Sequence, residues 1–275
     1  MSGSMTSRFL QRFLFVAAVG VTLNMPLAYA GSKALPPPDP AAAHCARYLV
    51  DEMHEVLKEG RYENFRGLED YRGLLGDWFL KHLYGLGRFA RWIDMGAGHG
   101  RAQREYLADK SNLAKNVVLG KAKTLAVAYE QPVFRDKAAL YDSTLPTPKR
   151  HQKLIGRFVE DIPDAELGKA DLITDVYGAL SYTDRLDEVL NKYLRILNDG
   201  GAIYFYTESL RTKIWRKDGT VLYLYEWLQT LQGLRVETDL RGYRITKTSP
   251  DAQVPQLKLI GGYASKPPAR IFKEQ

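Results

Sequence analysis

The stretch that decides the fold is Trp92-Ile93-Asp94-Met95-Gly96-Ala97-Gly98-His99-Gly100. An apolar run reaches a carboxylate at Asp94 and then turns through glycines spaced Gly-x-Gly-x-Gly. Glycine adopts backbone conformations that other residues resist, and it lets a ligand approach the main chain closely. A glycine loop between a first strand and a helix that opens at Arg101 predicts a Rossmann-like unit, with its ligand at the carboxyl end of that strand.

The loop does not match the two common nucleotide-binding patterns. The nicotinamide fingerprint Gly-x-Gly-x-x-Gly needs a third glycine where Arg101 stands. A phosphate-binding loop would end in Gly-Lys-Ser/Thr, which is missing here. The carboxylate of Asp94 would also repel phosphates. The loop therefore favours a ligand that presents a cationic or neutral donor to this carboxylate.

Strands and helices alternate around and after the loop. Strands are predicted at Phe89–Met95, Leu125–Glu130, within His151–Glu160, at Asp171–Val176 and at Ala202–Tyr206. Helices are predicted at Arg101–Ala108 and Asp184–Leu197, the second ended by Asn198-Asp199-Gly200-Gly201. This alternation predicts an α/β fold with a doubly wound, mostly parallel sheet.

The pattern changes after Thr207. Asp218-Gly219 is a hairpin-type turn, and Tyr223–Leu231 is expected to be helical. Three further strands with short connections are expected at Leu234–Asp239, Tyr243–Thr248 and Leu257–Tyr263. With the five strands above these make eight candidate strands, of which the predicted sheet takes seven, and that sheet is expected to finish antiparallel.

Two helical stretches precede the first strand, Ala41–Glu59 and Leu68–Leu83. Apolar residues recur in both at three- and four-residue spacing. We expect residues 41–87 to form an N-terminal helical cap on a domain of residues 88–275. The aromatic residues of the second stretch either line a site under this cap or belong to the core.

The first 30 residues have the pattern of a secretory signal peptide. Arg8 and Arg12 precede the apolar run Phe13–Leu23, and Ala28-Tyr29-Ala30 offers small residues for cleavage before Gly31. The run is short for a membrane span. We expect a periplasmic or secreted protein with a proline-rich linker over 31–40. The alternatives are an uncleaved anchor, with residues 13–27 in the membrane, or a cytoplasmic protein.

The composition excludes a disordered chain, a collagen-like chain and a disulfide scaffold. With 45% hydrophobic residues among 275, the chain has enough apolar residues for a core. A single cysteine, Cys45, allows neither an internal disulfide nor a cysteine metal cluster. The net charge is +7, yet no run of five basic residues indicates nucleic acid. No His/Asp/Glu set has metal-ligand spacing, so no metal site is predicted.

The order of these motifs resembles the class I S-adenosylmethionine-dependent methyltransferases over about residues 88–210. The resemblance implies that the amino-acid part of the cofactor is held by Asp94, Gly96, Gly98 and Gly100. It implies that Glu130, at the end of strand two, binds the ribose. It places Glu160 and Asp161, after strand three, near the adenine amino group. Asn198-Asp199-Gly200-Gly201 resembles the family's Pro-Gly-Gly turn before strand five.

The resemblance implies S-adenosylmethionine as cofactor and methyl transfer to an unidentified small molecule or protein. An in-line displacement from a sulfonium mainly requires two oriented reactants in a dry pocket. The rival hypothesis is a catalytically silent protein that keeps the fold and binds the cofactor. A nicotinamide oxidoreductase is disfavoured by Arg101. Export would place the protein away from the cytoplasm, where the cofactor is made.

Candidate catalytic groups follow strands four and five, where a base could meet an acceptor. They are Asp175, Tyr177, Ser181, Tyr182, Thr207 and Glu208. Each could instead cap a loop or pack in the core. Asp175 is not followed by Pro-Pro-Tyr/Phe, so the amino-methylating motif with that pattern is absent. His99 is expected beside the cofactor rather than as a base.

Overall fold

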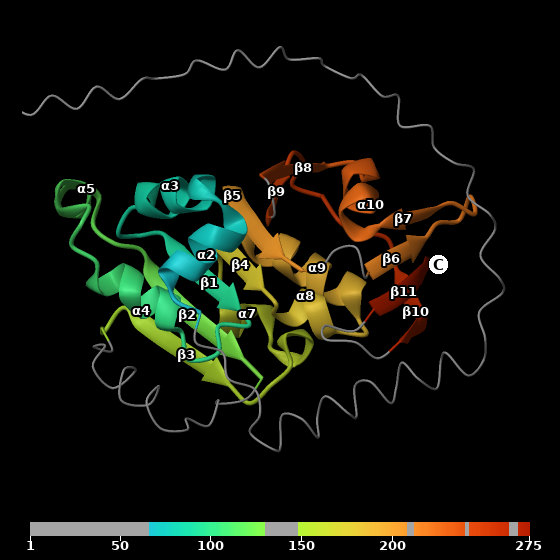
Figure 1. The fold of residues 1–275 in the computed structure, drawn as a ribbon, viewed down its shortest axis with the longest axis horizontal. Helices are drawn as coiled ribbons and strands as arrows, with labels where there is room; N and C mark the ends of the chain where they lie inside the picture. The colour runs from blue at the N-terminus through green and yellow to red at the C-terminus, as the bar shows by residue number, and fades with distance from the viewer. Residues whose placement is uncertain (1–65, 130–147, 208–211, 240–241, 264–268) are drawn as a thin grey trace, which may run out of the picture. The chain divides into compact units, whose positions relative to one another are not determined.

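The computed structural model describes residues 66–129, 148–207, 212–239, 242–263 and 269–275 (Figure 1). Several predictions therefore lie outside the described residues. They concern the signal peptide, the linker, the helix at Ala41–Glu59, the ribose residue Glu130 and the candidate Glu208. None of the helices in the described ranges is long and apolar enough to cross a membrane.

The main sheet has seven strands in the order β3-β2-β1-β4-β5-β9-β8 (Figure 1). The neighbours from β3 to β5 pair in parallel, whereas β9 runs antiparallel to both β5 and β8. The strands are β1 Arg91–Met95, β2 Lys123–Ala128, β3 His151–Ile155, β4 Ala170–Val176, β5 Leu197–Tyr206, β8 Leu234–Asp239 and β9 Gly242–Lys247. The predicted α/β fold, with a doubly wound, mostly parallel sheet and an antiparallel end, is confirmed.

The two faces of this sheet carry separate hydrophobic clusters. Alternation along β1 places Trp92 and Asp94 on one face and Ile93 and Met95 on the other. The Trp92 face packs against α2 Leu68–Leu75, α3 Asp77–Gly85 and α4 Arg101–Ala108. The Ile93 face packs against α7 Asp164–Leu167, α8 Ala179–Tyr182 and α9 Leu186–Ile196.

The strand order creates a topological switch point between β1 and β4. These strands are neighbours, but the chain leaves β1 towards α4 on one face and leaves β4 towards α8 and α9 on the other. In open α/β sheets the ligand crevice lies outside the carboxyl ends of strands at such a point. The fold therefore places the glycine loop where a ligand is expected.

The helix expected at Leu68–Leu83 is broken at Gly76. The backbone of Gly76 has φ +84, and a Cβ there would lie 2.7 Å from Oδ2 of Asp239. Only glycine fits both constraints, so the segment forms α2 and α3. Tyr71 and Phe79 are fully buried against the sheet. These aromatic residues are core, and α2 and α3 form a layer of the fold.

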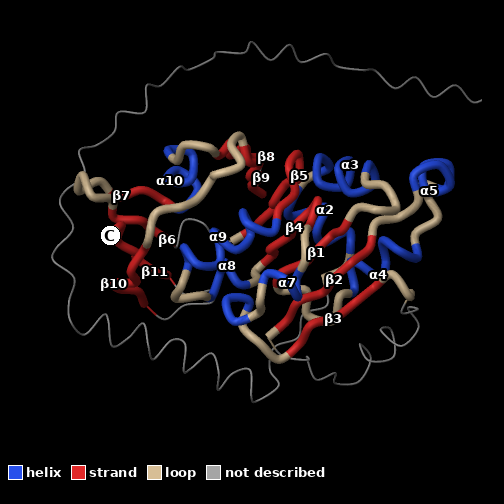
Figure 2. The backbone as a smooth tube through the Cα atoms, turned by 180° about the vertical axis from the view of Figure 1, so that it is seen from behind, coloured by secondary structure: helices blue, strands red, loops and turns tan. Residues whose placement is uncertain are grey.

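A second sheet of four strands was not predicted (Figure 2). Its order is β10-β11-β6-β7, with β6 Thr212–Trp215, β7 Val221–Tyr223, β10 Leu257–Tyr263 and β11 Ala269–Glu274. The strand expected at Leu257–Tyr263 belongs here and not to the main sheet. Phe272 and Ile214 join the cluster on the Ile93 face, together with α10 Leu224–Thr230. The sequence analysis also missed α5 Leu113–Leu119, α7 and the short 3-10 helix η1 Val159–Asp161.

Candidate functional site

All three glycines of the loop have positive φ. The values are +116 for Gly96, +52 for Gly98 and +69 for Gly100, a region that side chains disfavour. The amides of Gly96 and Ala97 both donate to the carbonyl of Val127, at 2.9 and 3.1 Å, and so tie the loop to the end of β2. Gly100 is the N-cap of α4. The backbone conformation alone therefore requires glycine at these positions.

Two of the loop glycines also face other parts of the protein. A Cβ on Gly96 would lie 2.3 Å from the Cα of Gly178, and a Cβ on Gly178 would lie 1.6 Å from the carbonyl oxygen of Met95. A Cβ on Gly100 would lie 2.8 Å from the His151 ring. The sequence pattern predicts that these glycines allow a ligand to approach the backbone, and the structure shows that Gly96 and Gly100 also permit close packing within the chain. Gly178 was missed, although a glycine just after strand four was visible in the sequence.

Asp94 is buried at the end of β1, with 1% of its surface exposed. The Tyr71 hydroxyl donates to Oδ2 at 2.7 Å, and the Thr174 hydroxyl donates to Oδ1 at 2.7 Å. The Trp92 indole N–H donates to Oγ1 of Thr174 at 2.8 Å and so orients that hydroxyl. A carboxylate has about four acceptor positions, and these contacts use two of them. Asp94 can therefore still accept hydrogen bonds from a ligand.

Burial raises the pKa of Asp94 to about 6, although the hydrogen bonds from Tyr71 and Thr174 oppose this shift. Burial, followed by the charge of Asp94, holds the pKa of Tyr71 well above its usual value. At neutral pH the carboxylate is therefore charged while the tyrosine keeps its proton and donates. The role of Tyr71 was missed, because in sequence it is only one apolar position on a helix.

Asp175 occupies the corresponding place on β4, on the opposite face, and is fully buried. Its Oδ1 accepts from the Gly178 amide at 2.9 Å, and its Oδ2 accepts from the Leu180 amide at 2.9 Å and the Tyr193 hydroxyl at 2.7 Å. Burial raises its pKa to about 7. These contacts hold the turn into α8, so they favour the loop-capping interpretation over a catalytic base.

The other end of α8 is held by Arg270 of β11. Its guanidinium donates to the carbonyl oxygen of Leu180 at 2.6 Å and to that of Thr183. Burial lowers the pKa of Arg270 to about 10. Asp175 thus satisfies the amides at the start of this short helix, and Arg270 satisfies the carbonyls at its end. The second sheet thereby fixes the turn that follows β4.

Tyr177 is the residue with φ +50, and no other non-glycine residue in the described ranges has positive φ. Its amide donates to the Tyr206 carbonyl at 3.0 Å, and the two rings meet edge to face at 5.0 Å. The Arg66 guanidinium lies 5.2 Å from the Tyr177 ring and donates to the Val176 carbonyl at 2.8 Å. A side chain held at positive φ is costly and points to a functional position. Tyr177 is therefore the strongest of the candidate catalytic residues.

The remaining candidates lie on α8 and at the end of β5. Ser181 and Thr207 are buried, and within the described part of the chain their hydroxyls have no hydrogen-bond partner. Tyr182 is half-buried on α8. His99, inside the glycine loop, is buried, and burial together with nearby Lys153 and Arg104 lowers its pKa to about 4. His99 is therefore neutral at physiological pH.

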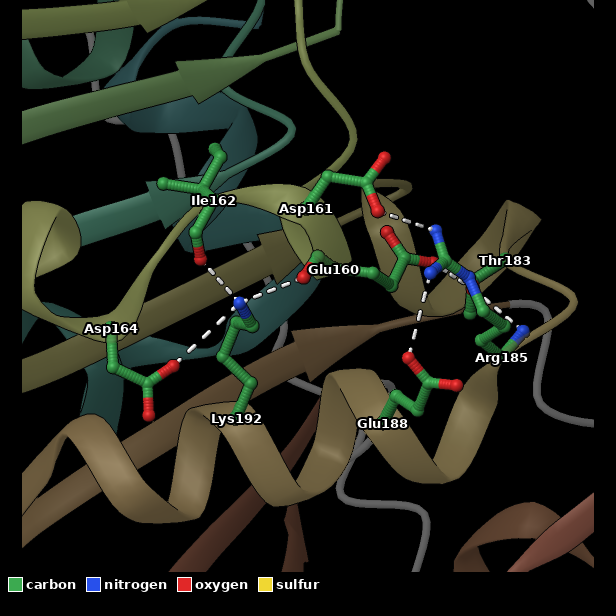
Figure 3. Close-up of polar contacts among 8 residues, drawn as sticks. All are labelled: Glu160, Asp161, Ile162, Asp164, Thr183, Arg185, Glu188 and Lys192. Carbon is green, nitrogen blue, oxygen red and sulfur yellow. Dashed lines mark hydrogen bonds and ion pairs between the residues drawn. The ribbon is translucent and has the colours of Figure 1, made fainter.

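The predicted adenine residues lie together on η1 (Figure 3). The Glu160 carboxylate accepts from the Thr183 hydroxyl, and Oδ1 of Asp161 is 3.0 Å from the Arg185 guanidinium. Lys192 of α9 donates to the backbone carbonyls of Glu160, at 2.9 Å, and of Ile162. The structure thus fastens η1 to α9, with both carboxylates directed towards the α8–α9 connection.

Two aromatic rings mark the carboxyl ends of β2 and β3. Tyr129 follows β2 directly, and Phe158 is the N-cap of η1. The rings stack with centroids 4.2 Å apart and an interplanar angle of 20°. Phe158 directly precedes the helix that carries the predicted adenine residues. Among the described residues, no group of three or more His, Cys, Asp or Glu side chains could hold a metal ion.

Comparisons with known proteins find methyltransferases at low similarity. No family model matches the chain, and no curated protein matches it. Among solved structures it is similar to an rRNA methylase from Streptococcus thermophilus. The identity is 14%, the match covers 62% of this chain and 95% of that chain, and the TM-score is 0.38.

Two further structures of this kind contain the cofactor or its product. One is phosphoethanolamine N-methyltransferase 2 of Haemonchus contortus with S-adenosyl-L-methionine, at 14% identity over 55% of this chain and 34% of that chain, TM-score 0.35. The other is a methyltransferase of Thiobacillus denitrificans with S-adenosyl-L-homocysteine, at 17% identity over 46% of each chain, TM-score 0.32. The chain thus spans about a third of the former and under half of the latter. At TM-scores this low, the fold assignment rests on the strand order itself.

Proposed function

We propose that this protein binds S-adenosylmethionine and transfers its methyl group to an acceptor. The observation that carries the proposal is the buried carboxylate of Asp94 beside a glycine loop, at the switch point between β1 and β4. A carboxylate with a pKa of about 6 is charged at neutral pH and complements an ammonium group. A phosphate-bearing nucleotide would be repelled there.

The other residues at this edge of the sheet fit the same cofactor. Tyr129 and Phe158 stack on each other, so the pair can offer a purine base an outer aromatic face, and planar rings stack favourably on such faces. Glu160 and Asp161 on the adjoining η1 are hydrogen-bond acceptors for an amino group. The donor and acceptor types therefore follow the order of the cofactor from its amino-acid end to its base. Glu130 remains the predicted ribose residue.

The cofactor supplies a methyl group that is already activated on a sulfonium, so the protein's task is orientation in a dry site. Asp94 and the loop hold the amino-acid end on one side of the switch point. Tyr177 and Thr207 stand at the carboxyl ends of β4 and β5, on the side left for the acceptor. The Tyr177 phenol is the group that we assign to positioning the acceptor.

A silent cofactor-binding protein is the second candidate, and one observation favours it. Asp175, the carboxylate nearest to the acceptor side, is buried and already accepts three hydrogen bonds. A base so occupied could not take a proton from an acceptor without disrupting the turn into α8. Binding is expected under both hypotheses, whereas transfer of a labelled methyl group is expected under the first alone.

Calorimetry on the full-length chain tests the proposal, with S-adenosylmethionine and S-adenosylhomocysteine as probes. Asp94→Asn should weaken binding by about tenfold to a hundredfold, because it removes a charge-assisted contact of about 1.5–3 kcal/mol. Asp171→Asn is the matched control. Asp171 also accepts two hydrogen bonds, from the Arg91 amide at 2.8 Å and the Asn198 amide group at 2.9 Å, but it starts β4. A folded wild-type chain that binds neither probe would refute the proposal.

A second measurement separates the two hypotheses. The full-length chain is incubated with methyl-labelled cofactor and an extract of the native host, and label in macromolecules and small molecules is counted. Transfer of the labelled methyl group by wild type, and its loss in Asp94→Asn, would support an active methyltransferase. Tight binding without transfer to either fraction supports the silent binding protein.

A further inference from the structure

Most of the large apolar side chains that are exposed to solvent, among the described residues, lie on or next to α5. Five of the six such side chains gather here, and we call them the α5 patch: Phe89 (83% exposed), Leu113 (59%), Val117 (76%), Val118 (82%) and Leu119 (39%). The Arg88 amide donates to the Leu119 carbonyl at 2.7 Å, so the segment with Phe89 lies against the end of α5. The five residues therefore form one surface.

Such a surface is unfavourable in water unless something covers it. Apolar area costs about 25 cal/mol per Å² when exposed, and contiguous apolar patches on a protein mark interaction sites. Val117 and Val118 do little to stabilise α5 itself, because β-branched residues have a low intrinsic preference for the helix. The α5 patch is thus better explained by a partner than by the stability of α5.

The charges around the α5 patch have a single sign. Between residues 78 and 129, the exposed charged side chains are all basic: Lys81, Arg88, Lys110, Lys115 and Lys123. The carboxylates in this stretch are not exposed. Asp94 is buried, Glu105 pairs with Arg101 at 2.7 Å, and Asp109 accepts from Tyr84 and Ser111. The stretch of chain that carries the α5 patch thus exposes basic side chains and no carboxylate between residues 78 and 129.

The α5 patch lies at the opposite edge of the sheet from the candidate site. Phe89 precedes β1 and α5 precedes β2, so both lie at the amino ends of these strands. In Figure 1 the arrows of β2 and β3 point away from α5. The glycine loop lies at the carboxyl ends. A partner on the α5 patch would leave the candidate site open.

We propose that the α5 patch docks on an anionic membrane surface. Exposed Phe, Val and Leu side chains can enter the boundary between headgroups and acyl chains, while surrounding lysines meet the anionic lipids. A second copy of this chain fits less well, because a two-fold contact would bring its basic residues against one another. In the alternative where the N-terminal segment stays uncleaved, the apolar run Phe13–Leu23 adds a second membrane-directed signal, and stable anchoring takes two signals.

The first test is flotation of the full-length chain with vesicles. Vesicles of phosphatidylcholine alone are compared with vesicles that also contain phosphatidylglycerol, at low and at high salt. We expect binding to the anionic vesicles that weakens with salt, since salt screens the attraction between surface lysines and anionic lipids. The double substitution Val117→Asp and Val118→Asp should reduce this binding by about tenfold or more. Ile155→Asp is the control, because Ile155 is the exposed apolar residue outside the patch. Equal flotation of all three proteins would overturn the proposal.

The second test separates contact at α5 from contact through residues 13–23. An environment-sensitive fluorophore is attached to Val118→Cys, in a chain whose own cysteine is replaced by Cys45→Ser. The emission should shift to the blue with anionic vesicles and stay unchanged when the label is at Ile155→Cys. Three results would contradict membrane docking. One is flotation without a shift, and another is a shift already present without vesicles, which indicates that the chain covers its own patch. The third is a dimer that the double substitution converts to a monomer.

Discussion

Asp94 and Asp175 end neighbouring strands of one sheet, and both are buried, yet the structure uses them differently. The donors to Asp94 are hydroxyls that belong to two other elements, α2 and β4. The donors to Asp175 are two amides of its own turn and the Tyr193 hydroxyl. Asp94 accepts two hydrogen bonds, whereas Asp175 accepts three, two of them from amides that its own turn holds in place. Burial of a carboxylate therefore does not identify a ligand site, and the origin of its hydrogen-bond donors is more informative.

The two carboxylates also influence each other. Burial is the largest cause of the raised pKa in both, and the charge of Asp94 raises the pKa of Asp175 further. Arg66, which also contacts Tyr177, lowers the pKa of Asp94. Both carboxyl groups therefore keep a proton to higher pH than an exposed aspartate does.

The largest effect on stability is expected where the turn after β1 meets the turn after β4. Gly178→Ala would place a Cβ 1.6 Å from the Met95 carbonyl oxygen, which forces β1 and β4 apart at their carboxyl ends. We expect a loss of unfolding free energy of about 3 kcal/mol or more in urea denaturation. Gly73→Ala is the control, because a Cβ there meets nothing within 4 Å and alanine favours α2. A Gly178→Ala chain as stable as wild type would show that the two turns are not in contact.

The next effect is the part of the pH dependence of stability that comes from Asp175. Its pKa is about 7 in the folded chain and near 3.8 when unfolded, so the folded state holds the extra proton between these values. The contribution of Asp175 to the unfolding free energy of the wild-type chain is thus fully present below about pH 4 and is lost as pH rises towards 7. Asp175→Asn lacks this titration. Its unfolding free energy relative to wild type should improve by about 1.4 kcal/mol for each pH unit between these two pKa values.

Urea denaturation at several pH values measures this difference. Asp171→Asn serves again as the control, and its stability relative to wild type should not follow the same curve. If the difference between Asp175→Asn and wild type is constant over the range, Asp175 is not the protonated group.

Much of the main sheet could be predicted because its signals are local. The boundaries of α4 agree with the sequence, since Gly100 opens the helix and the apolar period ends at Ala108. The acidic residue and glycines of the loop are also contiguous in the sequence. The second sheet has no such signal, because β11 pairs in parallel with β6 and joins Arg270 to Thr212 across a long separation.

The candidate site was predictable only where its residues follow a strand. Asp94, Glu160 and Asp161 could be located in this way, and the structure places each of them at the carboxyl edge of the sheet. Tyr71 could not be located, because its hydroxyl meets Asp94 only after α2 packs on the Trp92 face. Asp175 was predicted at the mouth of the site, but the sequence could not show that the following amides occupy it.

The smallest effect compares the two tyrosines that serve these carboxylates. Tyr71→Phe and Tyr193→Phe each remove one hydroxyl donor at 2.7 Å from a buried carboxylate, so each should cost about 1 kcal/mol of stability. Their effects on cofactor affinity should differ. The hydrogen bond from Tyr71 lowers the pKa of Asp94, so its removal raises that pKa. As the pH is lowered, Tyr71→Phe should therefore begin to lose cofactor affinity at a higher pH than wild type does. Tyr193→Phe should leave this profile in place, because Tyr193 acts on Asp175. Calorimetric affinities measured across the pH range distinguish the two, and the same shift in both variants would mean that Asp94 is not the group whose charge holds the ligand.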